Sequence, residues 1–235
     1  MDNKPQKRIQ LIDAARGLAV ILMVAHHALF DAVEFLGAPA WCFENPVFGV
    51  LHPIFAGLFI FLCGVSSRFS RSNVKRGLKT ASAAAVISIV TYFIEMPIIF
   101  GILHLLAVCM IMYGLCGKAI ERIPRKLAGV LWAAMIVVSA IAVRQLSFDA
   151  PLLWVLGWTR AGFYSADYFP LLPWIFVFLL GTWAGEPIRE SKLPQWFYDA
   201  KVKWLPSVGR KSFIIYLVHQ PLLYGITMLI LHLKK

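Results

Sequence analysis

Residues 11–36 have the sequence LIDAARGLAVILMVAHHALFDAVEFL, an apolar run long enough to cross a lipid bilayer as one helix. About 20 residues that each rise 1.5 Å cover the roughly 30 Å of hydrocarbon in a bilayer. Six further apolar segments follow along the chain, at 47–67, 78–96, 102–117, 127–145, 169–185 and 212–233. The sequence therefore predicts an all-α, polytopic integral membrane helical bundle of about seven transmembrane helices.

The composition of the whole chain agrees with this fold class. Of the 235 residues, 60% are hydrophobic and only 15% are charged, and the mean hydropathy is +0.73. In soluble domains, apolar residues make up about half of the chain. This composition excludes a soluble globular enzyme, a disordered tail and a secreted disulfide scaffold. Because the sequence shows no internal repeat and no low-complexity segment, we expect residues 1–235 to form a single transmembrane domain.

The basic residues are distributed unevenly along a chain whose net charge is +11. The N-terminus and the loops 68–79, 118–126 and 186–211 hold 18 of the 23 lysines and arginines, and seven crossings would place all four segments on one side. Basic loops are retained on the cytoplasmic side of a membrane. We therefore predict a cytoplasmic N-terminus and an external C-terminus. Orientation accounts for the charge, so nucleic acid is not an expected partner.

The first apolar segment holds most of the ionisable residues at membrane depth, where each is costly and usually faces a cavity or a partner. Asp13 and Arg16 are three residues apart, so they share a helix face and can pair. His27 and Asp31 are four residues apart and also share a face. A carboxylate that reaches an imidazole can orient it as a general base. Polar contacts between helices are the structural alternative for these residues.

Other histidines lie near the ends of membrane segments or within them. His52 precedes a proline in the second segment, and His104 opens the fourth. His219 is followed by Gln220 and Pro221, and the proline frees a backbone carbonyl, which is tolerated where the helix lines a cavity. Interhelical hydrogen bonds remain an alternative role for each histidine. The four cysteines show no metal-ligand spacing, and no metal is expected.

Four stretches of the sequence resemble transmembrane acyltransferases. The first is RIQLIDAARGLA at 8–19, which continues to His27, and the second is FGILHL at 100–105. The others are DYFPLLPW at 167–174 and VGRKSFIIYLVHQP at 208–221. The chain resembles the heparan-α-glucosaminide N-acetyltransferase-like family, including its short bacterial members. It is also similar to acyltransferase family three, which acylates cell-surface sugars.

The resemblance implies an enzyme that moves an acyl group, typically acetyl, from cytoplasmic acyl-CoA to a hydroxyl or amine of a sugar-like acceptor at or across the membrane. It implies residence in the lipid bilayer of a bacterial cytoplasmic membrane and leaves a homo-oligomer open. In its motifs Arg16, His27 and Asp31 match family positions. With the polar residues described above, we predict catalysis by His27 and Asp31 and donor binding by Arg16, Asp13 and Arg210. We predict an acceptor cavity that contains His104, Asp167, His219 and Gln220. In the lysosomal branch, the catalytic histidine lies in the loop before the second span, where this chain has Trp41, Cys42 and Phe43.

Several alternatives stay open on the sequence alone. Histidines in several spans are also typical of a haem-binding membrane electron carrier. A small transporter could use the same polar cavity without chemistry. For an enzyme, the acyl group can pass directly to the acceptor or through an acyl-histidine. The base is His27 or, alternatively, His52, His104 or His219.

Overall fold

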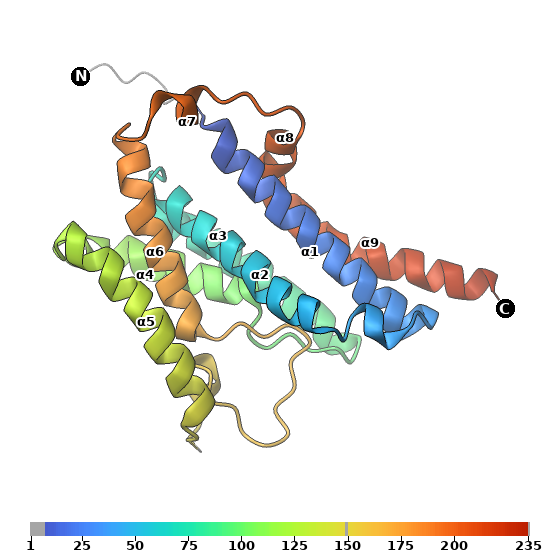
Figure 1. Ribbon diagram of the computed structural model, residues 1–235. Helices are drawn as coiled ribbons and strands as arrows, with labels where there is room; N and C mark the ends of the chain where they lie inside the picture. The colour runs from blue at the N-terminus through green and yellow to red at the C-terminus, as the bar shows by residue number, and fades with distance from the viewer. Residues whose placement is uncertain (1–7, 149, 235) are drawn as a thin grey trace. The chain divides into compact units, whose positions relative to one another are not determined.

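The computed structural model describes residues 8–148 and 150–234, and most of them are helical (Figure 1). Within these ranges there is no β-strand, which confirms the all-α class. Lys4, Lys7 and Lys235, counted above as basic residues, lie outside the described residues. The helices are α1 (Gln10–Leu36), α2 (Pro46–Ser67), α3 (Asn73–Phe93), α4 (Ile102–Ile120), α5 (Arg125–Gln145), α6 (Leu171–Arg189), α7 (Gln195–Asp199), α8 (Leu205–Arg210) and α9 (Ser212–Leu233).

Each of the seven predicted membrane segments contains one long helix, whose ends follow local sequence signals. Helix α1 ends at Gly37, which has a left-handed φ of 74° that glycine adopts without a steric penalty. The side chain of Ser72 caps α3 by accepting the N–H of Lys75 at 3.2 Å. Proline directly precedes α5 and α6, where a missing N–H costs nothing. The connection 186–211, expected to be a loop, also forms the short helices α7 and α8.

Six helices in the described ranges are long and apolar enough to span a membrane: α1, α2, α4, α5, α6 and α9. Helix α3 does not qualify, because its beginning contains Lys75, Arg76 and Lys79. The chain is thus a polytopic integral membrane protein.

Contacts divide the chain into two compact units, which we describe separately. The first contains the described residues up to Phe59 and those from Leu193 onward, and the second is Ile60–Lys192. The first unit therefore holds α1, the beginning of α2, and α7 to α9. The second holds the end of α2 and α3 to α6. That residues 1–235 act as one transmembrane domain stays a prediction.

In the first unit, α1 runs parallel to the segment formed by α8 and α9 (Figure 1). Near the start of α1, Gly17 lies so close to α8 that a Cβ would overlap the carbonyl oxygen of Leu205. Near its end, the ring of Phe35 lies 5.7 Å from that of Tyr224 in α9. Contact positions therefore rise together along both segments, so α1 and α9 cross the membrane in the same direction.

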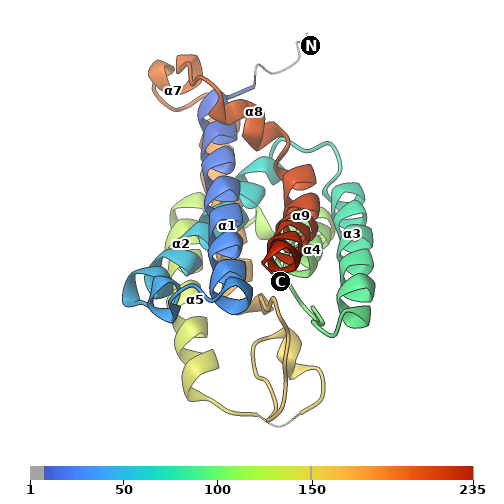
Figure 2. The same ribbon diagram turned by 90° about the vertical axis from the view of Figure 1, so that its right-hand side faces the viewer.

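In the second unit, α3 packs beside α4 (Figure 2), and the contacts between the two helices run in opposite directions along the chain. Gly77 of α3 lies against Ile111 of α4, and at the opposite end Ser88 lies 3.2 Å from a ring nitrogen of His104. Since α4 is a candidate span, α3 covers nearly the same depth despite its polar beginning.

Helices α2 and α6 cross closely at glycines in the same unit. Gly64 packs against the backbone of Phe178, and Gly185 packs against the backbone of Val65. Small residues let membrane helices approach closely. These contacts run in the same sense along both helices, so α2 and α6 are parallel. Successive membrane crossings alternate in direction. If α3 did not cross, α2 would be antiparallel to α6, and α1 to α9. The parallel pairing observed in each unit therefore favours seven crossings.

We expect residue 122, after α4, to be cytoplasmic and residue 234, after α9, to be external. Single cysteines at Arg122 and Lys234, in a background without the native cysteines, would be probed with a membrane-impermeant maleimide on intact cells. Only the cysteine at 234 should react. If α3 does not cross, the opposite pattern results, with labelling at 122 alone.

The glycine contacts of α1 should be sensitive to one added methyl group. Gly17→Ala and Gly209→Ala would each place a Cβ against backbone, the latter against the carbonyl oxygen of Asp13. We expect a loss of about 1–3 kcal/mol from overpacking, seen as a lower melting temperature in detergent. Gly225→Ala in α9 is the matched control, because a Cβ at this position would meet no atom within 4 Å, and it should not lower the melting temperature. Equal effects at all three positions would contradict this packing.

Candidate active site

Four histidines from α1, α2 and α9 lie together in the first unit. The rings of His27 and His219 have centroids 5.0 Å apart, and those of His26 and His52 stack at 4.3 Å with an interplanar angle of 15°. His26 and His27 are 5.7 Å apart. We call these four residues the histidine cluster. Ring contacts therefore connect all four histidines.

Asp31 lies one helical turn beyond His27 and is buried, with 1% of its surface exposed. Its Oδ1 accepts a hydrogen bond of 3.0 Å from Nε2 of Gln220. The described chain shows no hydrogen bond between Asp31 and His27, the partner that helical spacing suggested. Helix α9 instead brings the Gln220 amide to the level of Asp31, and this amide occupies one carboxylate oxygen.

The hydrogen bonding of His219 defines which of its nitrogens is free. Nδ1 lies 2.7 Å from the carbonyl oxygen of Tyr216. A carbonyl can only accept, so Nδ1 carries the proton of the neutral ring and donates it. Nε2 therefore presents a lone pair, and it is buried without a partner among the described residues.

Several other buried polar atoms of the same region also lack partners within the described part of the chain. These atoms are Nδ1 of His26, Oδ2 of Asp31 and Oε1 of Gln220. A buried polar atom left unpaired costs about 1–3 kcal/mol. Such atoms are rare in native proteins, and a group of them marks a place for water or a ligand. Three of the four atoms, including Nε2 of His219, are suited to accept hydrogen bonds.

The three residues predicted to bind the donor all lie at the beginning of α1 or on α8. Asp13 and Arg16 form the predicted ion pair, with Oδ1 and Nη1 2.8 Å apart. Arg210 ends α8, where its Nη2 donates to Oγ of Ser207 at 2.8 Å. Because the neighbouring Gly209 packs on Asp13, the three residues lie at the same end of the first unit.

His104 and Asp167 lie together in the second unit, at the beginning of α4. Nδ1 of His104 accepts the N–H of Gly101 at 3.2 Å, and its Nε2 lies 3.2 Å from Oγ of Ser88. Oδ2 of Asp167 accepts the N–H of Ile102 at 3.1 Å. Both side chains therefore satisfy free N–H groups at a helix start. The structure brings these two residues to the same helix start and places His219 and Gln220 beside α1 in the first unit.

Aromatic residues contact one another in the loop before α6. The hydroxyl of Tyr168 donates to the carbonyl oxygen of Trp154 at 2.5 Å. Burial raises the pKa of Tyr168 to about 12, so this residue stays a neutral donor at physiological pH. It supports the loop rather than supplying a base.

Two features of the structure were missed at the level of sequence. One is the stacking of His26 on His52. The other is an ion-pair network in which Arg68 contacts Glu121 and Glu186. In the sequence, this network is indicated only by the two carboxylates, Glu121 and Glu186, which lie in otherwise basic segments. Over the described residues, no group of three or more His, Cys, Asp or Glu is placed to hold a metal ion; that the chemistry needs no metal stays a prediction.

Comparison with known families identifies the family of the chain. The family model described as "Heparan-alpha-glucosaminide N-acetyltransferase, catalytic" matches residues 8–221, a range that contains every site residue named above. Comparisons with curated proteins and with solved structures gave no match. The chain therefore belongs to the heparan-alpha-glucosaminide N-acetyltransferase catalytic family and is an integral membrane protein of the acyltransferase class.

Proposed function

We propose that the protein transfers an acetyl group from cytoplasmic acetyl-CoA to a hydroxyl or amine of a sugar-like acceptor at or across the cytoplasmic membrane. The observation that supports this proposal best is the buried group of unpaired polar atoms around the histidine cluster. Acyl transfer requires a general base and hydrogen-bond acceptors that position the incoming nucleophile. It also requires a polar site that is separated from lipid. Family membership supports the reaction class.

The donor would enter from the end of α1 that carries Arg16. A guanidinium binds phosphate by charge-assisted hydrogen bonds, and Asp13 holds that of Arg16 in place. Arg210 on α8 offers a second guanidinium at the same end. His27 lies about 16 Å farther along α1 at 1.5 Å per residue, a distance that the pantetheine arm of acetyl-CoA would cover.

In the proposed reaction, His27 removes the proton of the acceptor hydroxyl or amine. The oxygen or nitrogen so activated forms a bond to the thioester carbonyl carbon. The bond from that carbon to sulfur then breaks, and the CoA thiolate leaves and is protonated by the imidazolium. In the alternative with an acyl-histidine, His27 itself attacks the carbonyl carbon first.

The hydrogen-bond acceptors around His27 suit a ligand with several hydrogen-bond donors. Nε2 of His219 and Oε1 of Gln220 present lone pairs, and Asp31 keeps one oxygen without a partner in the described chain. A sugar or an amine offers O–H or N–H groups to all three. Asp31, which binds Gln220, would position this amide rather than the imidazole of His27.

We expect His27→Ala to reduce acetyl transfer by about 10²–10⁴-fold, the usual contribution of a general base. Asp31→Asn should slow transfer less, because an asparagine oxygen can still accept from Gln220. Purified protein would be assayed for cleavage of the acetyl-CoA thioester with and without acceptor amines and sugars. His232→Ala is the matched control, since His232 is exposed at the end of α9, and should keep full activity.

Other outcomes of the same assay separate the alternatives. Full activity in His27→Ala would move the base to another histidine, with His219→Ala as the next variant. A wild-type protein that binds acetyl-CoA but never cleaves it would favour a transporter. A preparation with a haem absorption band would favour an electron carrier.

The assignment of Arg16 makes a separate prediction about donor binding. Arg16→Ala should raise the dissociation constant for acetyl-CoA roughly tenfold or more, because one charged hydrogen bond is worth about 1.5–3 kcal/mol. Wild-type affinity should also fall as salt is added. Isothermal titration in detergent would measure both effects, with the exposed Arg122→Ala as control. Unchanged affinity in Arg16→Ala would remove this residue from the donor site.

A further inference from the structure

A pocket of about 320 Å³ opens in the second unit, at the ends of α2, α4 and α6 and the beginning of α3. Its volume lies at the lower end of the range for small-molecule sites. One carboxylate, that of Glu121, lines the pocket. Four cationic side chains also line it, namely those of Arg68, Arg71, Lys118 and Arg189. The sequence-based topology places all these segments at the cytoplasmic surface.

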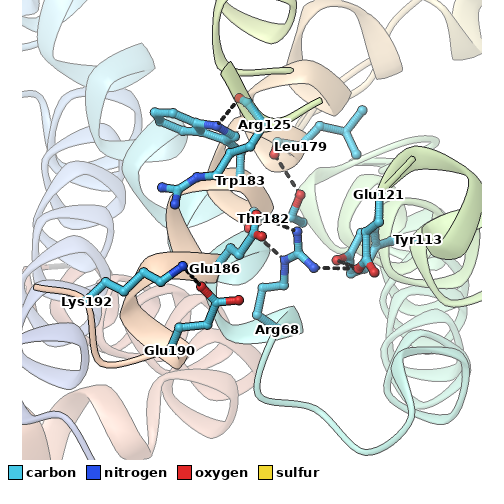
Figure 3. Close-up of polar contacts among 10 residues, drawn as sticks. All are labelled: Arg68, Tyr113, Glu121, Arg125, Leu179, Thr182, Trp183, Glu186, Glu190 and Lys192. Carbon is cyan, nitrogen blue, oxygen red and sulfur yellow. Dashed lines mark hydrogen bonds and ion pairs between the residues drawn. The ribbon is translucent and has the colours of Figure 1, made fainter. Parts of the chain in front are cut away.

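Arg68, Tyr113 and Glu121, which line the pocket, belong to a network of polar contacts (Figure 3). Nη1 of Arg68 contacts Oε1 of Glu121 at 2.5 Å, and its Nε donates to the carbonyl oxygen of Thr182 at 3.0 Å. The hydroxyl of Tyr113 also donates to Oε1 of Glu121, at 2.8 Å. The side chain of Arg68 is only 12% exposed. Nη2 of Arg68 also lies 3.5 Å from Oε2 of Glu186, so its charge is shared between two carboxylates. The positive excess of the lining therefore comes from its other cations.

Arg71 and Lys118 provide that excess at the rim. Both are exposed, and neither has a hydrogen bond or ion pair to another described residue. Like charges in one concave site repel each other unless an anion lies between them. Orientation in the membrane requires these residues on the cytoplasmic side, but it does not require them around one pocket.

The glycines of α4 shape the wall. Gly114 lets the first turn of α3 approach so closely that a Cβ would overlap Val74. The first turn of α3, with Asn73 and Val74, therefore belongs to the lining. A helix start carries a partial positive charge that adds to that of the side chains.

We propose that this pocket binds the phosphate group of an organic phosphate at the cytoplasmic face. Guanidinium and ammonium groups around one hollow suit a phosphate ester, which accepts several charged hydrogen bonds at once. Basic pockets at the cytoplasmic ends of membrane helices can take lipid head groups, and soluble diphosphates carry the same chemistry. The site is separate in its residues from the proposed acyl transfer and does not depend on it.

The test compares Arg71→Gln/Lys118→Gln with the matched pair Lys75→Gln/Lys126→Gln. The matched pair removes two exposed charges from the same two basic segments, 68–79 and 118–126, but outside the pocket lining. Each protein would be placed in phosphatidylcholine nanodiscs and titrated with inorganic pyrophosphate. Its melting temperature would then be measured in discs that contain phosphatidylglycerol. Wild type and the control pair should respond to at least one probe, and the pocket variant should bind at least about tenfold more weakly, as expected for lost charged hydrogen bonds.

The two probes identify the source of the phosphate. Stabilisation by phosphatidylglycerol alone indicates a lipid head group, and binding of pyrophosphate alone indicates a soluble ligand. A response to both supports a general phosphate site. No response in wild type, or an equal loss in the control pair, would overturn the proposal. Loss of acetyl transfer in His27→Ala is independent of these results, so the two proposals fail separately.

Discussion

The close approach of α1 to α8 determines the arrangement of the polar residues in the first unit. Gly17 and Gly209 have no side chains, so the two backbones touch where any larger residue would separate them. Because α9 continues directly from α8, this contact fixes how far α9 is shifted along α1. With that shift, His219 lies beside His27, and Gln220 lies beside Asp31. The polar side chains of α1 and α9, which lipid could not solvate, therefore lie in contact with one another.

Much of the fold could be predicted because the membrane imposes length and polarity on each helix. The seven apolar segments all became helices, with ends shifted by a few residues toward glycine, serine and proline signals. Helix α3 is the exception in hydropathy, since Lys75 and Lys79 extend its polar start. That α3 also crosses the membrane stays a prediction, and its antiparallel contact with α4 supports this prediction better than its composition does.

The candidate site could be predicted only in part, because helical spacing gives neighbours on one helix and not partners on another. The pair Asp13 and Arg16 formed as spacing suggested. Asp31 is equally well spaced from His27, but the amide of Gln220 from α9 is its hydrogen-bond partner. No pattern in one sequence gives the shift between α1 and α9, so neither this contact nor the stacking of His26 on His52 was predictable.

The two polar regions differ in the way they limit the cost of charge in a membrane. The region around His27 consists of histidine and amide groups that can be neutral, together with the buried acid Asp31. Most of its atoms without a hydrogen-bond partner carry a lone pair. In the pocket beside Arg68, the mostly buried guanidinium of Arg68 is paired with carboxylates. Arg71 and Lys118, which have no partner among the described residues, are exposed. Unpaired lone pairs attract a ligand with donors, whereas exposed cations attract an anion. The two regions therefore suit different ligands. Burying an unpaired charge in a membrane is costly, and this cost explains why the unpaired cations lie only at exposed positions.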